Sequence, residues 1–250
     1  MTEWRDYVGE FHDHRPAITE RLLTRTDHSP YEWLAEPLRG IDEPMLDLAC
    51  GSAPTRDHLP TAHWVGLDFS AAELAAAREA GRGPLVRASA DALPLRDRSL
   101  NAVCAAMCLP VVTPLDDVLG ELNRVMRPGA TLAALVPAGL GLSPAGWLGW
   151  LTVMRALGIR GQPWPNPEAR DGLARLLRTH GFDIVSDDRR VFRLDLTAPD
   201  STDLLVDSLY VPDLDPHRVD DAKRILRRRT TSRQRLPLPL RRVVASMPAP

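Results

Sequence analysis

Three aspartates lie in or directly after short apolar runs in the first hundred residues, and their spacing suits the binding of a polar ligand. Asp47 lies within the first run, Asp68 ends the second and Asp91 follows the third. Ligands of parallel sheets collect at the carboxyl ends of the strands, next to the point where the strand order reverses. We therefore expect these carboxylates to lie at one edge, where they can accept hydrogen bonds from ribose hydroxyls and an exocyclic amine.

The segment after Asp47 consists of small residues, Ala49-Cys50-Gly51-Ser52-Ala53. Small side chains allow backbone N–H groups to approach a ligand closely. Asp68 follows Gly51 by 17 positions, a distance that suits the end of the next strand. A dinucleotide dehydrogenase would need Gly-x-Gly-x-x-Gly at the start of a long helix. Residues 51–56 lack the second and third glycines, which disfavours that class.

Apolar runs alternate with helical patterns along the chain, as expected for βα units. Strands are predicted at 45–49, 63–68, 84–88, 102–107, 131–136, 192–196 and 238–246. A capping box, Ser70 with Glu73, begins a helix that stops at Gly81. Another helix is expected from Thr113 (N-cap) and Pro114 (first helical residue) to 127–129, and a third over 168–180. The fold class is therefore α/β: a doubly wound, mostly parallel seven-stranded sheet.

Four segments together carry a resemblance to a known family. They are 45–53, 65–70, 90–95 and 121–130, each weak alone but specific as an ordered set. The chain resembles the class I S-adenosylmethionine-dependent methyltransferases, in the ubiquinone-biosynthesis-like branch (methyltransferase type 11-like), over roughly residues 40 to 137. The resemblance implies a Rossmann-like fold, transferase activity and S-adenosylmethionine as cofactor.

The resemblance also assigns cofactor-binding roles to individual residues. The methionine part is expected at Asp47, Ala49 and Gly51; the ribose at Asp68; the adenine at Phe69, Asp91 and Ala92; and the sulfonium near Met107. The family often has glycine at the positions of Ala49 and Ala53, so this turn departs from the pattern.

Four regions are expected on this basis. Residues 1–40 form an N-terminal helical lid, and 41–137 form the cofactor-binding α/β core. Residues 138–170 form an apolar insert on the acceptor side, and 171–250 complete the sheet around a helical insert at about 199–230.

Transfer of a methyl group from a sulfonium needs alignment and exclusion of water, and needs a base only where the nucleophile must lose a proton. Residues 106–110 lack the Asn-Pro-Pro-Tyr motif of some enzymes that methylate nitrogen. Candidate catalytic groups lie instead in the N-terminal segment: His12 or His14 as base, and Tyr7 to orient the substrate. The alternative interpretation is that they are surface and capping residues of a helical lid.

Trp147, Trp150 and Trp164 lie in the insert. They predict either an aromatic wall for a small hydrophobic acceptor, with oxygen acceptors favoured, or a helix docked on the core or on a second subunit, as in a homodimer. The alternative function is a methyltransferase-fold protein that binds the cofactor but catalyses a non-methylating reaction such as cyclisation, or acts as a binding module.

Composition excludes several other classes. A net charge of −2, and a basic run at 223–229 that has no interleaved aromatics, argue against nucleic-acid binding. The uncharged stretch 130–154 is broken by proline and glycine, which argues against a membrane span. The three cysteines have no zinc-site spacing, so no metal is expected. The charged N-terminus has no apolar signal core, and the arginine-rich composition suggests a bacterial source, so we expect a cytoplasmic bacterial enzyme.

Overall fold

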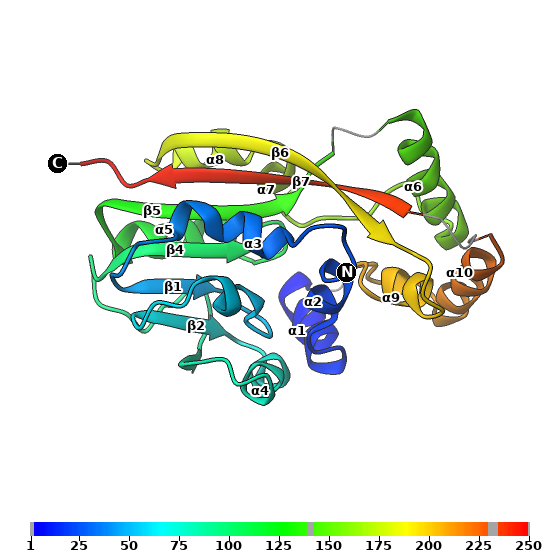
Figure 1. Ribbon diagram of the computed structural model, residues 1–250, viewed down its shortest axis with the longest axis horizontal. Helices are drawn as coiled ribbons and strands as arrows, with labels where there is room; N and C mark the ends of the chain where they lie inside the picture. Colours follow the sequence, from blue (N-terminus) through cyan, green and yellow to red (C-terminus); the bar gives the residue numbers. More distant parts are fainter. Residues whose placement is uncertain (1–2, 140–142, 230–234, 250) are drawn as a thin grey trace.

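The computed structural model describes residues 3–139, 143–229 and 235–249, and a seven-stranded sheet runs through its centre (Figure 1). The strand order is β3-β2-β1-β4-β5-β7-β6; β7 runs antiparallel to both β5 and β6, and the other pairs are parallel. The strands are β1 Met45–Leu48, β2 Trp64–Asp68, β3 Leu85–Arg87, β4 Leu100–Ala106, β5 Met126–Pro137, β6 Asp183–Asp195 and β7 Arg235–Ser246. The predicted fold class is confirmed.

Helices cover both faces of the sheet, since successive side chains of a strand point to opposite sides. Leu46 and Leu48 of β1 pack in one core with α5 (Leu115–Val125), α7 (Pro167–Asp171) and α8 (Leu173–Thr179). Met45 packs in the second core with α3 (Pro30–Ala35), η1 (Glu36–Leu38) and α4 (Ala71–Glu79), and with Ala53 and Leu59 at the two ends of η2 (Pro54–His58). Because both faces of these strands are covered, their sequences are nearly continuous apolar runs.

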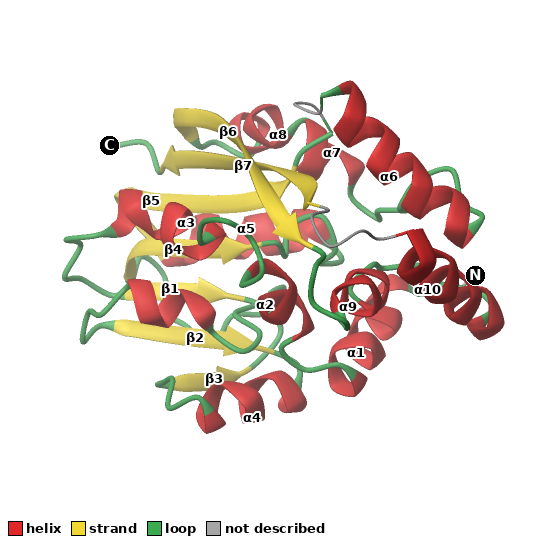
Figure 2. Ribbon diagram, turned by 45° about the vertical axis from the view of Figure 1, so that its right-hand side comes forward, coloured by secondary structure: helices red, strands yellow, loops and turns green. Residues whose placement is uncertain are grey.

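The remaining helices lie at the carboxyl end of the sheet. In Figure 1 the arrows of β1 and β2 point toward α1 (Trp4–His14) and α2 (Ile18–Leu23), and Figure 2 shows the same arrangement. Farther out, α6 (Pro144–Leu157), α9 (Ser201–Asp207) and α10 (Pro216–Arg229) form a separate apolar cluster with Leu194 and Leu236. Within the described residues, no helix is long and apolar enough to cross a membrane.

Four local predictions were wrong. Pro114 is itself the N-cap of α5, because its extended ψ of 131° cannot begin a helix. Met126 already pairs with Leu100, so 127–129 lie inside β5 instead of ending the helix. The helix expected over 168–180 breaks at Gly172 into α7 and α8. Strand β6 spans Asp183–Asp195, far longer than the expected 192–196.

Candidate functional site

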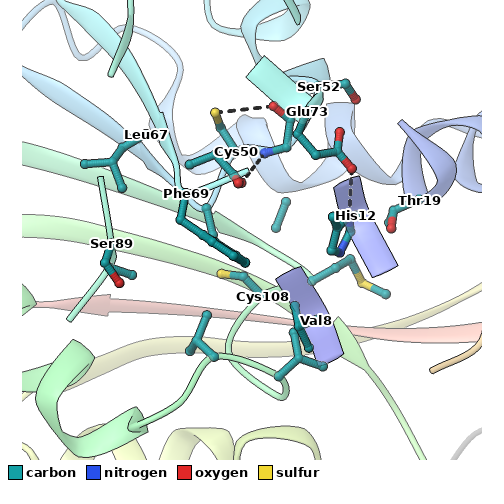
Figure 3. Close-up of a pocket in the computed structure, with 18 of the residues that line it drawn as sticks. Val8, His12, Thr19, Cys50, Ser52, Leu67, Phe69, Glu73, Ser89 and Cys108 are labelled. Carbon is teal, nitrogen blue, oxygen red and sulfur yellow. Dashed lines mark hydrogen bonds and ion pairs between the residues drawn. The ribbon is translucent and has the colours of Figure 1, made fainter. Parts of the chain in front are cut away.

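A pocket opens where the loops after β1, β2, β3 and β4 meet α1 and α2 (Figure 3). It encloses about 990 Å³, open solvent at its mouth included. On the sheet side it is lined by residues 49–52, 67–69, 88–91 and 106–108. On the helical side it is lined by Arg5, Val8, His12, Ala17, Thr19, Glu20, Tyr31, Glu73, Val111, Val112, Thr113, Val118 and Tyr210.

The turn after β1 holds three residues in the left-handed conformation: Ala49 (φ 48°), Gly51 (φ 55°) and Ala53 (φ 58°). Glycine adopts this conformation readily, whereas an alanine costs about 1–2 kcal/mol there. The two alanines stand where the resembling family often has glycine, and they take up a glycine-like backbone. Their departure from the family pattern therefore leaves the course of the turn unchanged.

Asp68 connects this turn to the end of β2. One carboxylate oxygen, Oδ2, accepts from the Gly51 N–H at 2.8 Å, and Oδ1 accepts from the Ser70 N–H at 2.9 Å. The side chain is only 6% exposed, and burial raises its pKa against the opposing effect of these two hydrogen bonds. Each oxygen retains a lone pair, and Asp68 lines the pocket, so it can accept further hydrogen bonds from a ligand.

Asp47 lies behind the turn and does not line the pocket. Its Oδ2 accepts from the Thr55 hydroxyl, whereas Oδ1 has no hydrogen-bond partner among the described residues. Burial raises its pKa to about 7. The side chain of Asp47 therefore contributes to the pocket only by supporting the turn above it, because it does not reach the pocket itself.

Asp91 is held in place by hydrogen bonds from α1 and from its own loop. Arg5 of α1 donates to it at 2.8 Å, and Ser89 donates to the same carboxylate. The hydrogen bond from Ser89, and then the guanidinium of Arg5, lower the pKa of Asp91 against the effect of burial. Phe69 lines the pocket and is 38% exposed. Ala92 does not line it, and its N–H donates to the Ser89 carbonyl within the turn.

Met107 lines the pocket directly after β4 in a left-handed conformation, with φ 63°. Its N–H donates to the Leu135 carbonyl at 2.7 Å, which fixes the start of the loop that carries Cys108. Of the cofactor residues expected from the sequence, the pocket lining therefore brings together Ala49, Gly51, Asp68, Phe69, Asp91 and Met107.

The three candidate catalytic residues of the N-terminal segment separate. His12 lines the pocket, whereas His14 and Tyr7 do not. His14 is exposed, and its Nδ1 lies 2.7 Å from the Glu10 carbonyl of the same helix. The Tyr7 hydroxyl accepts from the Val211 N–H at 2.9 Å, and burial raises its pKa. Only His12 is placed to meet a substrate.

Glu73 and Tyr210 are pocket residues that the sequence did not reveal. The capping box predicted for Ser70 and Glu73 forms by half: the Ser70 hydroxyl accepts from the Glu73 N–H at 3.2 Å. The Ser70 N–H donates to Asp68, so the Glu73 carboxylate is free to bond elsewhere. In the sequence, the spacing of Ser70 and Glu73 indicated only a helix cap, so a role for the Glu73 carboxylate in the pocket was not predicted. Tyr210 comes from the helical insert, where no motif marks it.

The tryptophan insert lies apart from the pocket. Of the described residues between 143 and 170, none lines it. Trp147 is 60% exposed on α6, and Trp150 donates from Nε1 to the Pro237 carbonyl of β7 at 2.7 Å. Trp164 packs against the apolar cluster that includes Phe11 and Tyr210, and its ring centroid lies 6.2 Å from that of Tyr210. The aromatic wall expected from the sequence is therefore not formed by Trp147 and Trp150, because α6 docks on β7 and α10 instead.

The charges around the pocket are mostly negative. Four carboxylates line it, those of Glu20, Asp68, Glu73 and Asp91, against the single guanidinium of Arg5. Such a lining attracts a cation and repels a pyrophosphate. Within the described residues, no group of three or more His, Cys, Asp or Glu side chains is arranged to hold a metal ion.

Comparison with known proteins finds methyltransferases. Residues 46–134 match the family model described as a methyltransferase domain. The malonyl-[acyl-carrier protein] O-methyltransferase of Alcanivorax borkumensis is 39% identical over 101 residues, 37% of this chain and 34% of that protein. The demethylmenaquinone methyltransferase of Thermus thermophilus is 38% identical over 100 residues, 36% of this chain and 46% of that protein. The chain thus matches less than half the length of these relatives.

Solved structures share the fold over nearly the whole chain. The [4+2]-cyclase SpnF has a TM-score of 0.60 at 16% identity, covering 97% of this chain and 96% of the cyclase. A geranyl diphosphate methyltransferase in complex with its diphosphate and sinefungin has a TM-score of 0.53 at 13% identity, covering 98% and 99%. At such identities the likeness establishes the Rossmann-like architecture alone.

Proposed function

The chain belongs to the class I S-adenosylmethionine-dependent methyltransferases of the ubiquinone-biosynthesis-like type, and we propose that it transfers a methyl group from that cofactor to a small, largely apolar molecule. When bound, the cofactor supplies a methyl group on a sulfonium, which is already an activated leaving group. The work left to the protein is to bind, align and exclude water.

The residues of the pocket fit this cofactor. The mostly negative lining suits the positive charge of its sulfonium and ammonium groups, and the unpartnered Oδ1 of Asp47 lies beneath the turn where the methionine part would bind. Asp68 would accept from the ribose hydroxyls, and Asp91 from the adenine amine. Phe69, an exposed aromatic ring on the pocket wall, offers a face for the adenine.

The observation that carries the proposal is the placement of Asp68, which fixes the turn and lines the pocket with the same carboxylate. Calorimetry with S-adenosylhomocysteine tests it. We expect micromolar binding to the native chain and a loss of at least about 100-fold in Asp68→Ala, since two or more hydrogen bonds to a charged group disappear.

Asp97→Ala is the matched control, because Asp97 is 74% exposed and pairs only with Arg124. Asp91→Ala is a second test variant that leaves the turn after β1 intact. A thermal unfolding temperature close to that of the native chain would show that a variant is folded, so that its loss of affinity reflects lost binding contacts. Equal affinity of the native chain, Asp68→Ala and Asp91→Ala would refute the assignment.

The acceptor side of the pocket supports a small molecule. Val8, Val111 and Val112 contribute apolar wall, and polar groups of the same lining include the hydroxyls of Thr19 and Tyr210 and the ring of His12. An oxygen acceptor is favoured, because a hydroxyl matches these groups. Labelled-methyl transfer to a panel of small phenols, amines and carboxylic acids measures the choice.

A non-methylating reaction, such as a cyclisation, or a role as a binding module is the second candidate. The observation that favours it is that both ring nitrogens of His12 already have hydrogen-bond partners. The same labelled cofactor separates the two functions: under the second, the cofactor binds and its methyl group stays in place with every acceptor.

Three further expectations belong to this proposal. We place the enzyme in the cytoplasm and expect no nucleic-acid partner; three cations of α10, Lys223, Arg224 and Arg227, are neutralised by ion pairs with aspartates. A homodimer would use the exposed pair Trp147 and Leu148 of α6. Sedimentation of the native chain and of Trp147→Glu tests the last point.

A further inference from the structure

Three side chains from distant parts of the chain form a continuous hydrogen-bonded series at the inner end of the pocket. His12 Nδ1 lies 2.7 Å from Glu73 Oε1, and His12 Nε2 lies 2.9 Å from the Tyr210 hydroxyl. Figure 3 shows the Glu73 carboxylate directed at His12. The Glu73–His12–Tyr210 series thus connects α4, α1 and the segment after α9 across the cavity.

The chemistry of Glu73 fixes the direction of the first bond. A carboxylate only accepts, so Nδ1 of His12 carries a proton and donates it to Glu73. When the ring is neutral, Nε2 accepts from the Tyr210 hydroxyl. The Glu73 carboxylate holds the ring in this tautomer and would stabilise the imidazolium that forms when Nε2 gains a proton.

Glu73 is held tightly enough to serve this purpose. Its side chain is 3% exposed, and its second oxygen accepts from the Ala17 N–H at 2.9 Å. A buried carboxylate is costly unless its oxygens are hydrogen-bonded, and here the cost is offset by His12 and Ala17. His12 has no comparable burial need, being 16% exposed at the pocket wall.

Tyr210 faces the cavity from the other end of the series. It lines the pocket, and the Thr19 hydroxyl, also in the lining, is hydrogen-bonded to it. Burial, and after it the nearby charge of Glu73, raises the pKa of Tyr210 well above its usual value. The phenol therefore stays protonated, so it can pass a proton on only by receiving another.

We propose that the Glu73–His12–Tyr210 series is a proton relay that receives the proton of a neutral hydroxyl acceptor. The inference rests on the proposed methyl transfer and names its substrate class. As the acceptor oxygen bonds to the methyl carbon, the methyl–sulfur bond breaks, with its electron pair going to sulfur. The acceptor O–H proton passes to the Tyr210 oxygen, and the Tyr210 proton passes to His12 Nε2. Tyr210 is then the catalytic residue, and His12 and Glu73 act through it.

The relay excludes acceptors that are already deprotonated. A carboxylate or thiolate is already deprotonated, so it would not use a proton acceptor, and it would enter a pocket lined by four carboxylates. A small phenol or enol, neutral and largely apolar, fits the valine wall and brings the one proton that the relay takes.

The first test combines the acceptor panel with three variants, Tyr210→Phe, His12→Gln and Glu73→Gln. With the native chain we expect methyl transfer to phenols. Each of the first two variants should lower kcat by about 100-fold or more, the usual range of general acid–base catalysis. In Tyr210→Phe and His12→Gln, KM and the affinity for S-adenosylhomocysteine should stay within about threefold of the native values. His14→Gln is the matched control, because His14 lies on the same helix, exposed and outside the pocket.

The pH profile supplies a readout that lost packing would not change. Acid should slow the native enzyme by protonating His12 in advance, and this limb should vanish in His12→Gln. Glu73, Tyr210 and Asp68 are the titratable groups that interact with His12. Glu73→Gln removes the charge that would stabilise the imidazolium, and its amide offers one acceptor oxygen where the carboxylate offers two, so its acid limb should move to lower pH.

Nitrogen NMR of the imidazole rings tests the relay without turnover. It should find His12 protonated at Nδ1, with the Nε2 resonance shifting toward that of an unbonded nitrogen in Tyr210→Phe. Preferred transfer to carboxylic acids, equal kcat in Tyr210→Phe, or a proton on Nε2 of the neutral ring would overturn the relay and leave cofactor binding intact. Loss of S-adenosylhomocysteine binding in the native chain would instead refute the proposed function itself.

Discussion

Replacement of Asp47 by asparagine tests how far the site strains the fold. Asp47 is fully buried in the core beneath the turn after β1, and one of its oxygens has no partner in the described part of the chain. Burial raises its pKa from 3.8 to about 7. The charged form therefore costs stability at neutral pH, and the neutral amide in the Asp47→Asn variant would not carry that cost.

The size and sign of the effect follow from linkage. Between pH 3.8 and about 7 the folded chain holds the proton that the unfolded chain has released, so the free energy of unfolding falls as pH rises through this window. At about 1.4 kcal/mol for each pKa unit, the loss is about 4 kcal/mol when complete. Asp47→Asn cannot ionise and keeps an oxygen for the Thr55 hydroxyl, so it escapes this loss.

Denaturant unfolding of native and variant proteins from pH 4 to pH 8 measures the difference directly. The free energy of unfolding of Asp47→Asn, relative to the native chain, should rise by about 4 kcal/mol across the window. Asp42→Asn is the matched control, because exposed Asp42 accepts from the Thr61 hydroxyl at 2.8 Å; its difference should stay constant. A constant difference for Asp47→Asn as well would refute the reasoning.

Three other perturbations have definite expected outcomes. Arg5→Ala removes a half-exposed ion pair that occupies Asp91, so calorimetry should find S-adenosylhomocysteine binding tighter by up to about fivefold, with weaker binding contradicting a competing role for Arg5. Ala49→Gly relieves a left-handed alanine at φ 48°, and denaturant unfolding should show about 0.5–1 kcal/mol more stability; a loss would show that the turn is unstrained. Asp187→Asn leaves Arg241, only 5% exposed, without its bidentate partner, and should cost about 2 kcal/mol. Arg241 lowers the pKa of Asp187, so this contribution is present above about pH 4 and lost as pH falls further; an equal cost at pH 2 would contradict it.

The sheet core was predictable because its signals are local. The apolar runs that became β1, β2 and β4 are continuous since both faces of these strands are covered. Apolar residues at helical spacing identified α5, whose face from Leu115 to Val125 is buried. Strand β6 was mostly missed because residues 183–190 are mostly polar and mainly exposed, and β7, the one strand that pairs with them in the described structure, comes some fifty residues later.

The two ends of the pocket were not equally predictable. Ala49, Gly51, Asp68, Phe69, Asp91 and Met107 follow strand ends, so the sheet itself dictates that they meet. The contact between His12 and Tyr210 joins positions 198 apart, and it depends on how α1 and the insert dock. No periodicity or turn signal encodes such docking, which is why His12 could be singled out but its partners could not.

The residues that line the pocket come partly from inside and partly from outside the matched domain. The matched methyltransferase domain ends at residue 134 and begins at 46, so it contains Glu73 but neither His12 nor Tyr210. Both acceptor-side groups come from helical segments outside the matched region, and Glu73 reaches them only because Ser70 bonds to Asp68. The family model covers the part that would hold the cofactor, and under the proposed relay the part outside the matched region would select the acceptor. A substrate inferred from the relatives by similarity would therefore rest on residues that bind the cofactor. A substrate found by screening acceptors with variants of the Glu73–His12–Tyr210 relay would rest on the groups proposed to act on it.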